Sequence, residues 1–120
     1  MKPLLPNKFE EFLNRFQNFE DGEFRSLKIV DATTMKATFA VQDAARDFDW
    51  LTIELEFSGV NDARLINDSQ LSLVDMSDGI SLVADGNKVG FSIGKYNITS
   101  INNSICYIMF NNLKYQEGLF

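Results

Sequence analysis

The chain has 120 residues, with 11 basic and 17 acidic side chains and a formal net charge of −6. Hydrophobic residues make up 45% and charged residues 23%, as in a folded globular protein, and the length suits a single domain spanning residues 1–120. The absence of histidine excludes Ser-His-Asp and Cys-His catalysis and histidine-ligated metals, and the acidic charge disfavours binding to nucleic acid.

An amphipathic helix is predicted near the N-terminus, beginning near Asn7 and ending before Gly22. Asn7 and Glu10 form a capping-box pattern at its start. Apolar residues recur at helical spacing along one face: Phe9, Phe12, Leu13, Phe16 and Phe19. We expect this aromatic face to cover a sheet of the same chain; the alternative is a stripe that binds a partner.

After Gly22 the apolar period changes to two, which is typical of strands with one buried face. Strands are predicted at Leu27–Ile29, Met35–Val41, Leu51–Phe57, Leu71–Leu73, Ile80–Ala84, Val89–Ile93 and Ile105–Phe110. The segment Asp85-Gly86-Asn87-Lys88 predicts a hairpin. We therefore expect an α+β fold: one N-terminal amphipathic helix packed on a curled, mostly antiparallel sheet or two-layer β structure of about seven strands, mostly in meander order.

The strand predicted at Ile105–Phe110 is apolar on both faces. This pattern fits either a central strand covered on both sides or an edge strand through which the chain would form a homodimer. Cys106, the one cysteine, is expected to be a small buried side chain in this strand.

The sequence shows no apolar signal-peptide segment and no window approaching about 18 consecutive apolar residues. We expect a cytoplasmic protein with no membrane contact.

Acidic side chains are the candidates for acid–base chemistry, and Asp43, Asp47 and Asp49 lie in one predicted loop. Arg46 lies among them and offsets part of their charge. The calcium-loop pattern and the glycine motifs that bind phosphate are both absent. We predict no enzymatic activity, no metal and no cofactor.

An acidic interaction surface is predicted instead. Glu54 and Glu56 point to the same side of one strand. Together with the loop before that strand they define a partner-binding surface for a basic protein, formed by Asp43, Asp47, Asp49, Trp50, Glu54 and Glu56.

Two further possibilities concern ligands. A small apolar ligand could occupy a pocket between the helix and the sheet, lined by Phe12, Phe16, Phe39, Phe57 and Phe91. The stretch from Tyr96 to Leu113 is uncharged and rich in asparagine, at positions Asn97, Asn102, Asn103, Asn111 and Asn112. These carboxamides either contact a polar ligand or shape the turns beside a buried strand.

The segment from Asp49 to Val60 reads as an alternating strand that ends in Phe-Ser-Gly-Val. With Leu27-Lys28-Ile29 before it and Asp78-Gly79-Ile80 after it, residues 24 to 84 resemble small bacterial domains, some of which are immunity proteins of toxin systems. The resemblance implies a non-enzymatic cytosolic protein that binds one partner, and it carries no catalytic residue.

Overall fold

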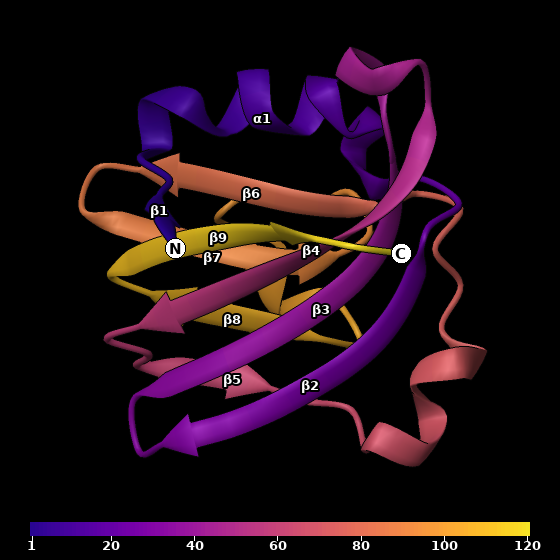
Figure 1. Cartoon of the computed structure of the whole chain (residues 1–120). Helices are drawn as coiled ribbons and strands as arrows, with labels where there is room; N and C mark the ends of the chain where they lie inside the picture. Colours follow the sequence, from indigo (N-terminus) through magenta and orange to yellow (C-terminus); the bar gives the residue numbers. More distant parts are fainter.

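The computed structural model describes residues 1–120 as two antiparallel sheets and one short helix (Figure 1). The first sheet, sheet A, has the strand order β1-β9-β4-β3-β2, and the second, sheet B, has the order β5-β8-β7-β6. The strands are β1 (Lys2–Pro3), β2 (Glu23–Asp31), β3 (Thr34–Asp43), β4 (Asp49–Ser58), β5 (Asp62–Arg64), β6 (Ile80–Asp85), β7 (Lys88–Ile93), β8 (Tyr107–Phe110) and β9 (Asn112–Gly118). The predicted α+β class is confirmed, but with nine strands rather than seven and with sheets that are not strongly curled.

The helix α1 (Phe9–Arg15) is shorter than predicted. It is flanked by the 3-10 turns η1 (Pro6–Lys8) and η2 (Gln17–Phe19), and no side chain caps its start, so the capping-box prediction was wrong. Three further 3-10 turns are η3 (Ala44–Arg46), η4 (Asp68–Leu73) and η5 (Ile101–Asn103). No helix has the length and hydropathy needed to cross a membrane.

The helix ends early because the backbone turns left-handed at Gln17, Asn18 and Phe19, which all have positive φ. The Asn18 carbonyl packs against the backbone of Gly79, where an added Cβ would lie 1.9 Å from that oxygen. This contact fixes the turn against the start of sheet B. The turn directs both Phe16 and Phe19 into the core, where their rings are buried.

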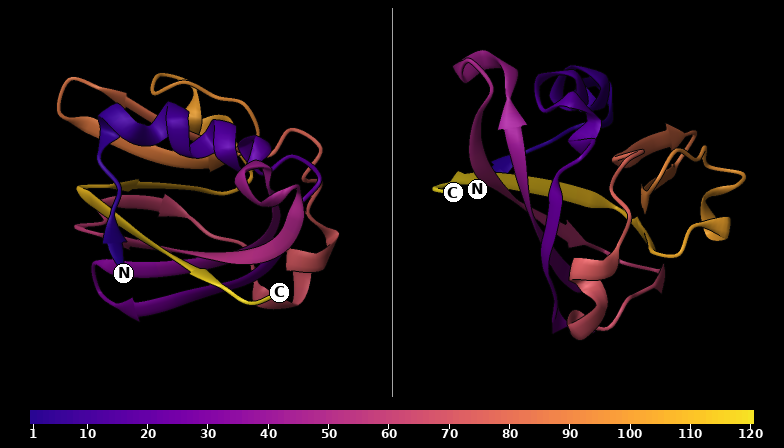
Figure 2. Two further views of the ribbon diagram at one scale, coloured as in Figure 1. Left: turned by 45° about the horizontal axis from the view of Figure 1, so that its top comes forward. Right: turned by 90° about the vertical axis from the view of Figure 1, so that its right-hand side faces the viewer.

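The helix closes one side of the space between the two sheets. In the right-hand view of Figure 2, α1 lies end-on between the edge of sheet A and the edge of sheet B, and η4 lies at the opposite side. Phe12 contacts Tyr115 of β9, and Phe19 contacts Phe39 of β3, with ring centroids 5.0 and 5.3 Å apart. The expectation that the aromatic face of the helix covers a sheet of the same chain is therefore confirmed.

Aromatic rings also join the two sheets. Phe57 of β4 lies 5.0 Å from Phe91 of β7 and 5.0 Å from Phe110 of β8, measured between ring centroids. Of the strands that carry these residues, β4 alternates buried and half-exposed positions as predicted, whereas β7 and β8 are buried at most positions.

The strand assignments differ from expectation in four places. Leu71–Leu73 lies in the 3-10 turn η4, and β1, β5 and β9 were not predicted. The strand predicted at Ile105–Phe110 is β8, which lies between β5 and β7 and is thus central in its sheet. Its backbone therefore offers no free edge for the predicted homodimer.

Candidate functional site

The connection between β3 and β4 carries most of the residues predicted to bind a partner. Asp43 ends β3, η3 follows it, and β4 begins at Asp49. The structure separates these residues into a buried member, Asp43, and an exposed group formed by Asp47, Asp49 and Trp50.

Asp43 is fully buried, which corrects its assignment to a solvent-facing acidic surface. Arg15 of α1 donates Nε to Oδ1 at 2.9 Å and Nη2 to Oδ2 at 2.8 Å, and the amide of Ala45 donates to Oδ1 at 2.9 Å. The reason is strand parity, because Asp43 continues the inward-facing positions of β3 and meets the helix at the strand end.

Asp43 belongs to a cluster of four charges that balance one another. Arg15 also donates to Glu117 at 2.8 Å, and Arg46 lies 3.5 Å from Asp43 and 3.6 Å from Glu117. The hydrogen bonds from Arg15 hold the pKa of Asp43 below its usual value, and Asp43 in turn raises the pKa of Arg15. The cluster joins α1, β3 and β9, and its carboxylates are already satisfied within the chain.

Asp47 and Asp49 lie in solvent at the end of the molecule and form no ion pair. Asp47 and Phe48 both have positive φ, at 57° and 63°, a conformation that is rare for an aromatic residue. The loop therefore holds two free carboxylates around the exposed ring of Phe48.

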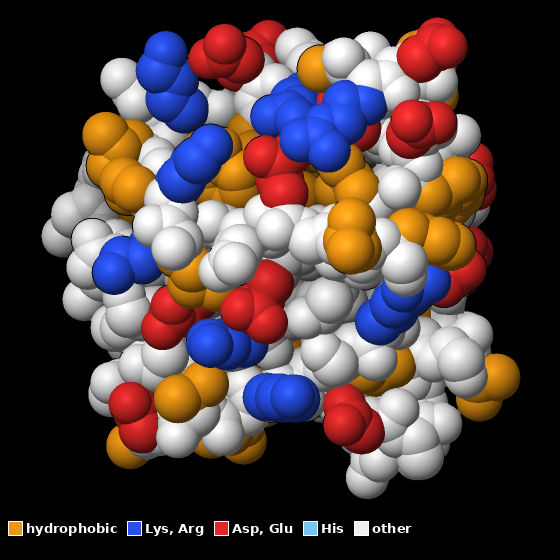
Figure 3. Space-filling model, viewed as in Figure 1, with side chains coloured by type: hydrophobic (Ala, Val, Ile, Leu, Met, Phe, Trp, Pro, Cys, Tyr) orange, Lys and Arg blue, Asp and Glu red, His pale blue; other side chains and the backbone are white.

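Two exposed aromatic residues lie beside this loop and contact each other, and we call them the aromatic patch: Trp50 and Phe120. The rings of Trp50 and Phe120 lie 5.6 Å apart, and their side chains are 39% and 60% exposed. Arg25 of β2 lies 4.5 Å from the Phe120 ring and donates to the Phe120 carbonyl oxygen at 3.1 Å. In Figure 3, hydrophobic side chains interrupt the polar surface of sheet A on the side where β9 ends.

Sequence reasoning found Trp50 but missed Phe120, its neighbour in the patch. Phe120 reaches Trp50 only because β9 pairs with β4, and this strand was not predicted. The hydroxyl of Thr52 donates to the carbonyl oxygen of Leu119 at 3.3 Å, which extends the pairing beyond the strand.

Glu54 and Glu56 face outward from β4 as predicted, but the surface around them is not uniformly acidic. Lys36 Nζ lies 3.7 Å from Glu54 Oε1, and in the strand register Glu56 stands between Lys36 of β3 and Lys114 of β9. Figure 3 shows blue and red side chains side by side on this face. The predicted acidic surface is therefore restricted to Asp47 and Asp49.

The apolar pocket predicted between helix and sheet is filled by the side chains expected to line it. These are Phe12, Phe16, Phe39, Phe57 and Phe91, all buried in one core. Phe12 lies 5.0 Å from Phe16, and Phe39 lies 6.1 Å from Phe91, between ring centroids. A surface depression of about 290 Å³ does lie between α1 and β6, but none of the five rings lines it.

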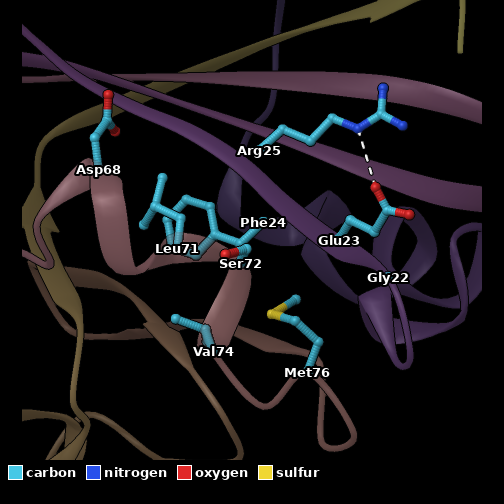
Figure 4. A pocket seen from close by; sticks show the side chains of 9 residues that line it. All are labelled: Gly22, Glu23, Phe24, Arg25, Asp68, Leu71, Ser72, Val74 and Met76. Carbon is cyan, nitrogen blue, oxygen red and sulfur yellow. Dashed lines mark hydrogen bonds and ion pairs between the residues drawn. The ribbon is translucent and has the colours of Figure 1, made fainter.

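A groove of about 490 Å³ lies between β2 and η4 (Figure 4). Its charged groups are engaged within the chain: Arg25 pairs with Glu23 at 3.2 Å, and Asp68 accepts from the amide of Leu27 at 3.3 Å. Figure 4 shows Arg25 extended toward Glu23, away from the apolar floor around Leu71. The groove therefore presents no cluster of unpaired charges.

Reactive groups do not gather elsewhere. Cys106 is buried, and this burial raises the pKa of its thiol to about 12, so the thiolate is scarce at neutral pH. No three cysteine, aspartate or glutamate side chains are placed to hold a metal ion.

Comparisons with family models, with curated proteins and with solved structures gave no significant match to this chain. The candidate site is thus defined by its geometry: an aromatic patch, two free carboxylates, and a loop held in place by the Arg15–Asp43 pair.

Proposed function

We propose that this chain is a non-enzymatic cytosolic interaction protein that binds a basic protein partner through the aromatic patch and the carboxylates of Asp47 and Asp49. The observation that carries the proposal is the exposed contact between Trp50 and Phe120. Aromatic residues and arginine dominate the binding energy of protein interfaces, and here Arg25 lies against the Phe120 ring.

Charge supports a basic partner rather than an acidic one. Asp47 and Asp49 have no ion-pair partner in the chain, so a lysine or arginine of the partner would gain a charge-assisted contact there. The exposed faces of Trp50 and Phe120 attract cations as well. Glu54 and Glu56 belong to the periphery of this surface, because lysines already offset their charge.

An immunity-type inhibitor is the specific form of this proposal that the strand pattern of residues 24 to 84 suggests. A protein of that kind would block a basic toxin by covering its surface. An inhibitor of this type needs no catalytic group, and the one thiol of the chain is buried.

The test begins with capture of the partner from the native host and continues with that partner in purified form. Trp50→Ala should weaken binding by about 2 kcal/mol or more, as for interface hot spots. Leu73→Ala is the matched control, because Leu73 is a large apolar residue, 81% exposed, on the separate turn η4. Equal binding by Trp50→Ala and wild type would remove the patch from the proposal.

A second arm tests the charges. Asp47→Asn combined with Asp49→Asn should slow association at low salt and reduce its salt dependence. An association rate equal to that of wild type at two salt concentrations would show that the partner does not contact these carboxylates.

A further inference from the structure

The largest hollow of the molecule lies on the outer face of sheet B, on the side away from sheet A and the aromatic patch. It has a volume of about 910 Å³ and is bounded by the β6–β7 hairpin, the connection that contains η5, and the residues beside β5 and β8. The η5 connection is the orange segment at the right of the right-hand view of Figure 2. We call this hollow the amide groove. Its polar side chains include Asn61, Asp62, Asn87, Thr99, Asn102 and Asn111.

Two groups of asparagines differ in the hydrogen bonds of their side chains. Asn67 and Asn97 shape turns: Oδ1 of Asn67 accepts from the amide of Ser69, and Oδ1 of Asn97 accepts from the amide and hydroxyl of Thr99. The carboxamides in the amide groove form no hydrogen bond within the chain: Asn61, Asn87, Asn102 and Asn111. Their side-chain donors and acceptors are therefore free to contact a ligand.

The wall that carries Asn102 is held in place. Arg64 Nη1 donates to the main-chain carbonyl oxygens of Asn102 and Ser104, both at 3.0 Å. The connection also packs closely on β7 at Gly90, where an added Cβ would lie 2.6 Å from Ile101 Cδ1. A wall fixed in this way loses little conformational freedom when a ligand binds.

The chemistry of the groove is mainly neutral. Lys88 is its only basic residue and stands opposite Asp85 in the strand register, so the groove has no cationic cluster for a phosphate or another anion. Asp62 accepts a hydrogen bond from the Tyr107 hydroxyl at 3.1 Å. Ile98 and Met109, which both lie over Gly90 of β7, add partly exposed apolar surface between the amides.

We propose that the amide groove binds a neutral oligosaccharide. A carboxamide both donates and accepts, so it matches the hydroxyl groups of a sugar, which do the same. The apolar C–H faces of sugar rings would pack on Ile98 and Met109. The volume is near the upper end for ligand sites, which favours several sugar units over one.

The experiment uses the ¹⁵N-labelled full chain and follows side-chain amide signals by NMR during titration with maltohexaose, cellohexaose, xylohexaose and chitohexaose. At least one of these should give saturable shifts at Asn61, Asn87, Asn102 and Asn111, with Asn67 at the start of the separate turn η4 unmoved. No saturable shift at millimolar concentration of any of the four would overturn the proposal. Saturable shifts that are produced by a neutral peptide and by none of the sugars would also overturn it.

Asn102→Leu and Asn103→Leu form a matched pair, since both residues are exposed in η5 and only Asn102 lines the groove. Asn102→Leu should weaken binding of the sugar that shifts these signals by about tenfold, the effect of losing the hydrogen bonds of one carboxamide. Asn103→Leu should bind as wild type does. Equal affinity of both variants would overturn the assignment, and native main-chain spectra check that each variant is folded.

Discussion

Arg15 and Asp43 join the helix to the end of β3 through a two-point hydrogen bond, in which Nε and Nη2 of the guanidinium each donate to a different carboxylate oxygen. The carboxylate is fully buried, whereas the arginine side chain is one-third exposed. The pair therefore sets both the position of α1 and the start of the loop that leads to Trp50.

Replacing Arg15 should leave the buried Asp43 carboxylate with Arg46 as its remaining cationic partner. We expect Arg15→Met to lower the free energy of unfolding by about 3 kcal/mol, near the lower end for a broken buried pair, because Arg46 remains 3.5 Å from Asp43. Urea denaturation gives this value, with Lys8→Met as control, since Lys8 is exposed just before the same helix. A loss no larger than that of the control would mean that Arg15 contributes nothing to the fold.

The same pair predicts a pH dependence. Arg15 lowers the pKa of Asp43 below 3.8 in the folded chain, so the ionised carboxylate stabilises the fold above that value. This contribution should be lost as the pH falls through the lower, folded pKa. Unfolding free energies measured between about pH 5 and pH 2 should fall less steeply for Asp43→Asn than for wild type. Parallel curves would contradict the assignment.

The aromatic face of the helix closes the core. Phe16 is 1% exposed and contacts both Phe12 and Phe19. Phe16→Ala should therefore lower the free energy of unfolding by about 3–5 kcal/mol, with a similar loss for Phe12→Ala. Asn14→Ala, on the exposed side of α1, is the control and should change stability by less than about 0.5 kcal/mol. If the free energy of unfolding fell by less than about 1 kcal/mol for both phenylalanine variants, the core would not depend on being covered by α1.

Cys106 should react slowly with a thiol reagent in the native state and rapidly once the chain is unfolded. Its side chain is fully buried in the core, and its thiol pKa is raised to about 12. Labelling is followed by mass spectrometry with and without denaturant. Fast native labelling would mean that the segment leading into β8 opens readily.

Reversing the charges of Glu54 and Glu56 should now cost stability. The outward direction of both side chains predicts a change of about 1 kcal/mol or less in either direction. The structure gives the change a sign, because the new lysines would lie beside Lys36 and Lys114. We expect Glu54→Lys combined with Glu56→Lys to lower the free energy of unfolding by about 1 kcal/mol, and added salt to restore part of it. Glu54→Gln combined with Glu56→Gln should have a smaller effect, and identical melts for both pairs would argue against cross-strand charge contacts.

The residues at the inward positions of each strand explain which features could be predicted from the sequence and which could not. Alternation located β3 and β4, because their inward residues are nearly all apolar. Asp43 shares this inward parity, but a charged side chain beside a turn is ordinarily predicted to be solvent-exposed. Its burial depends on the ion pair with Arg15, which lies 28 residues away in the sequence. The β9 strand was hidden for the same reason, since Tyr115 and Glu117 occupy its inward positions.

The charge pairs between neighbouring strands were the feature that the sequence predicted least well. The neutralisation of Glu54 by Lys36 depends on which residues stand opposite one another, and a strand pattern does not give the register. The patch had the same difficulty, since Trp50 and Phe120 meet only through the pairing of β4 with β9.

The place of β9 between β1 and β4 has a consequence for the order of folding. The chain leaves sheet A after β4, builds all of sheet B, and only then returns to pair with both strands. On the ribosome, β2, β3 and β4 would emerge and pair as a meander, while the open side of β4 and the short β1 would wait unpaired until β9 emerged. During synthesis that open side is the part of the molecule most exposed to mispairing with another nascent chain.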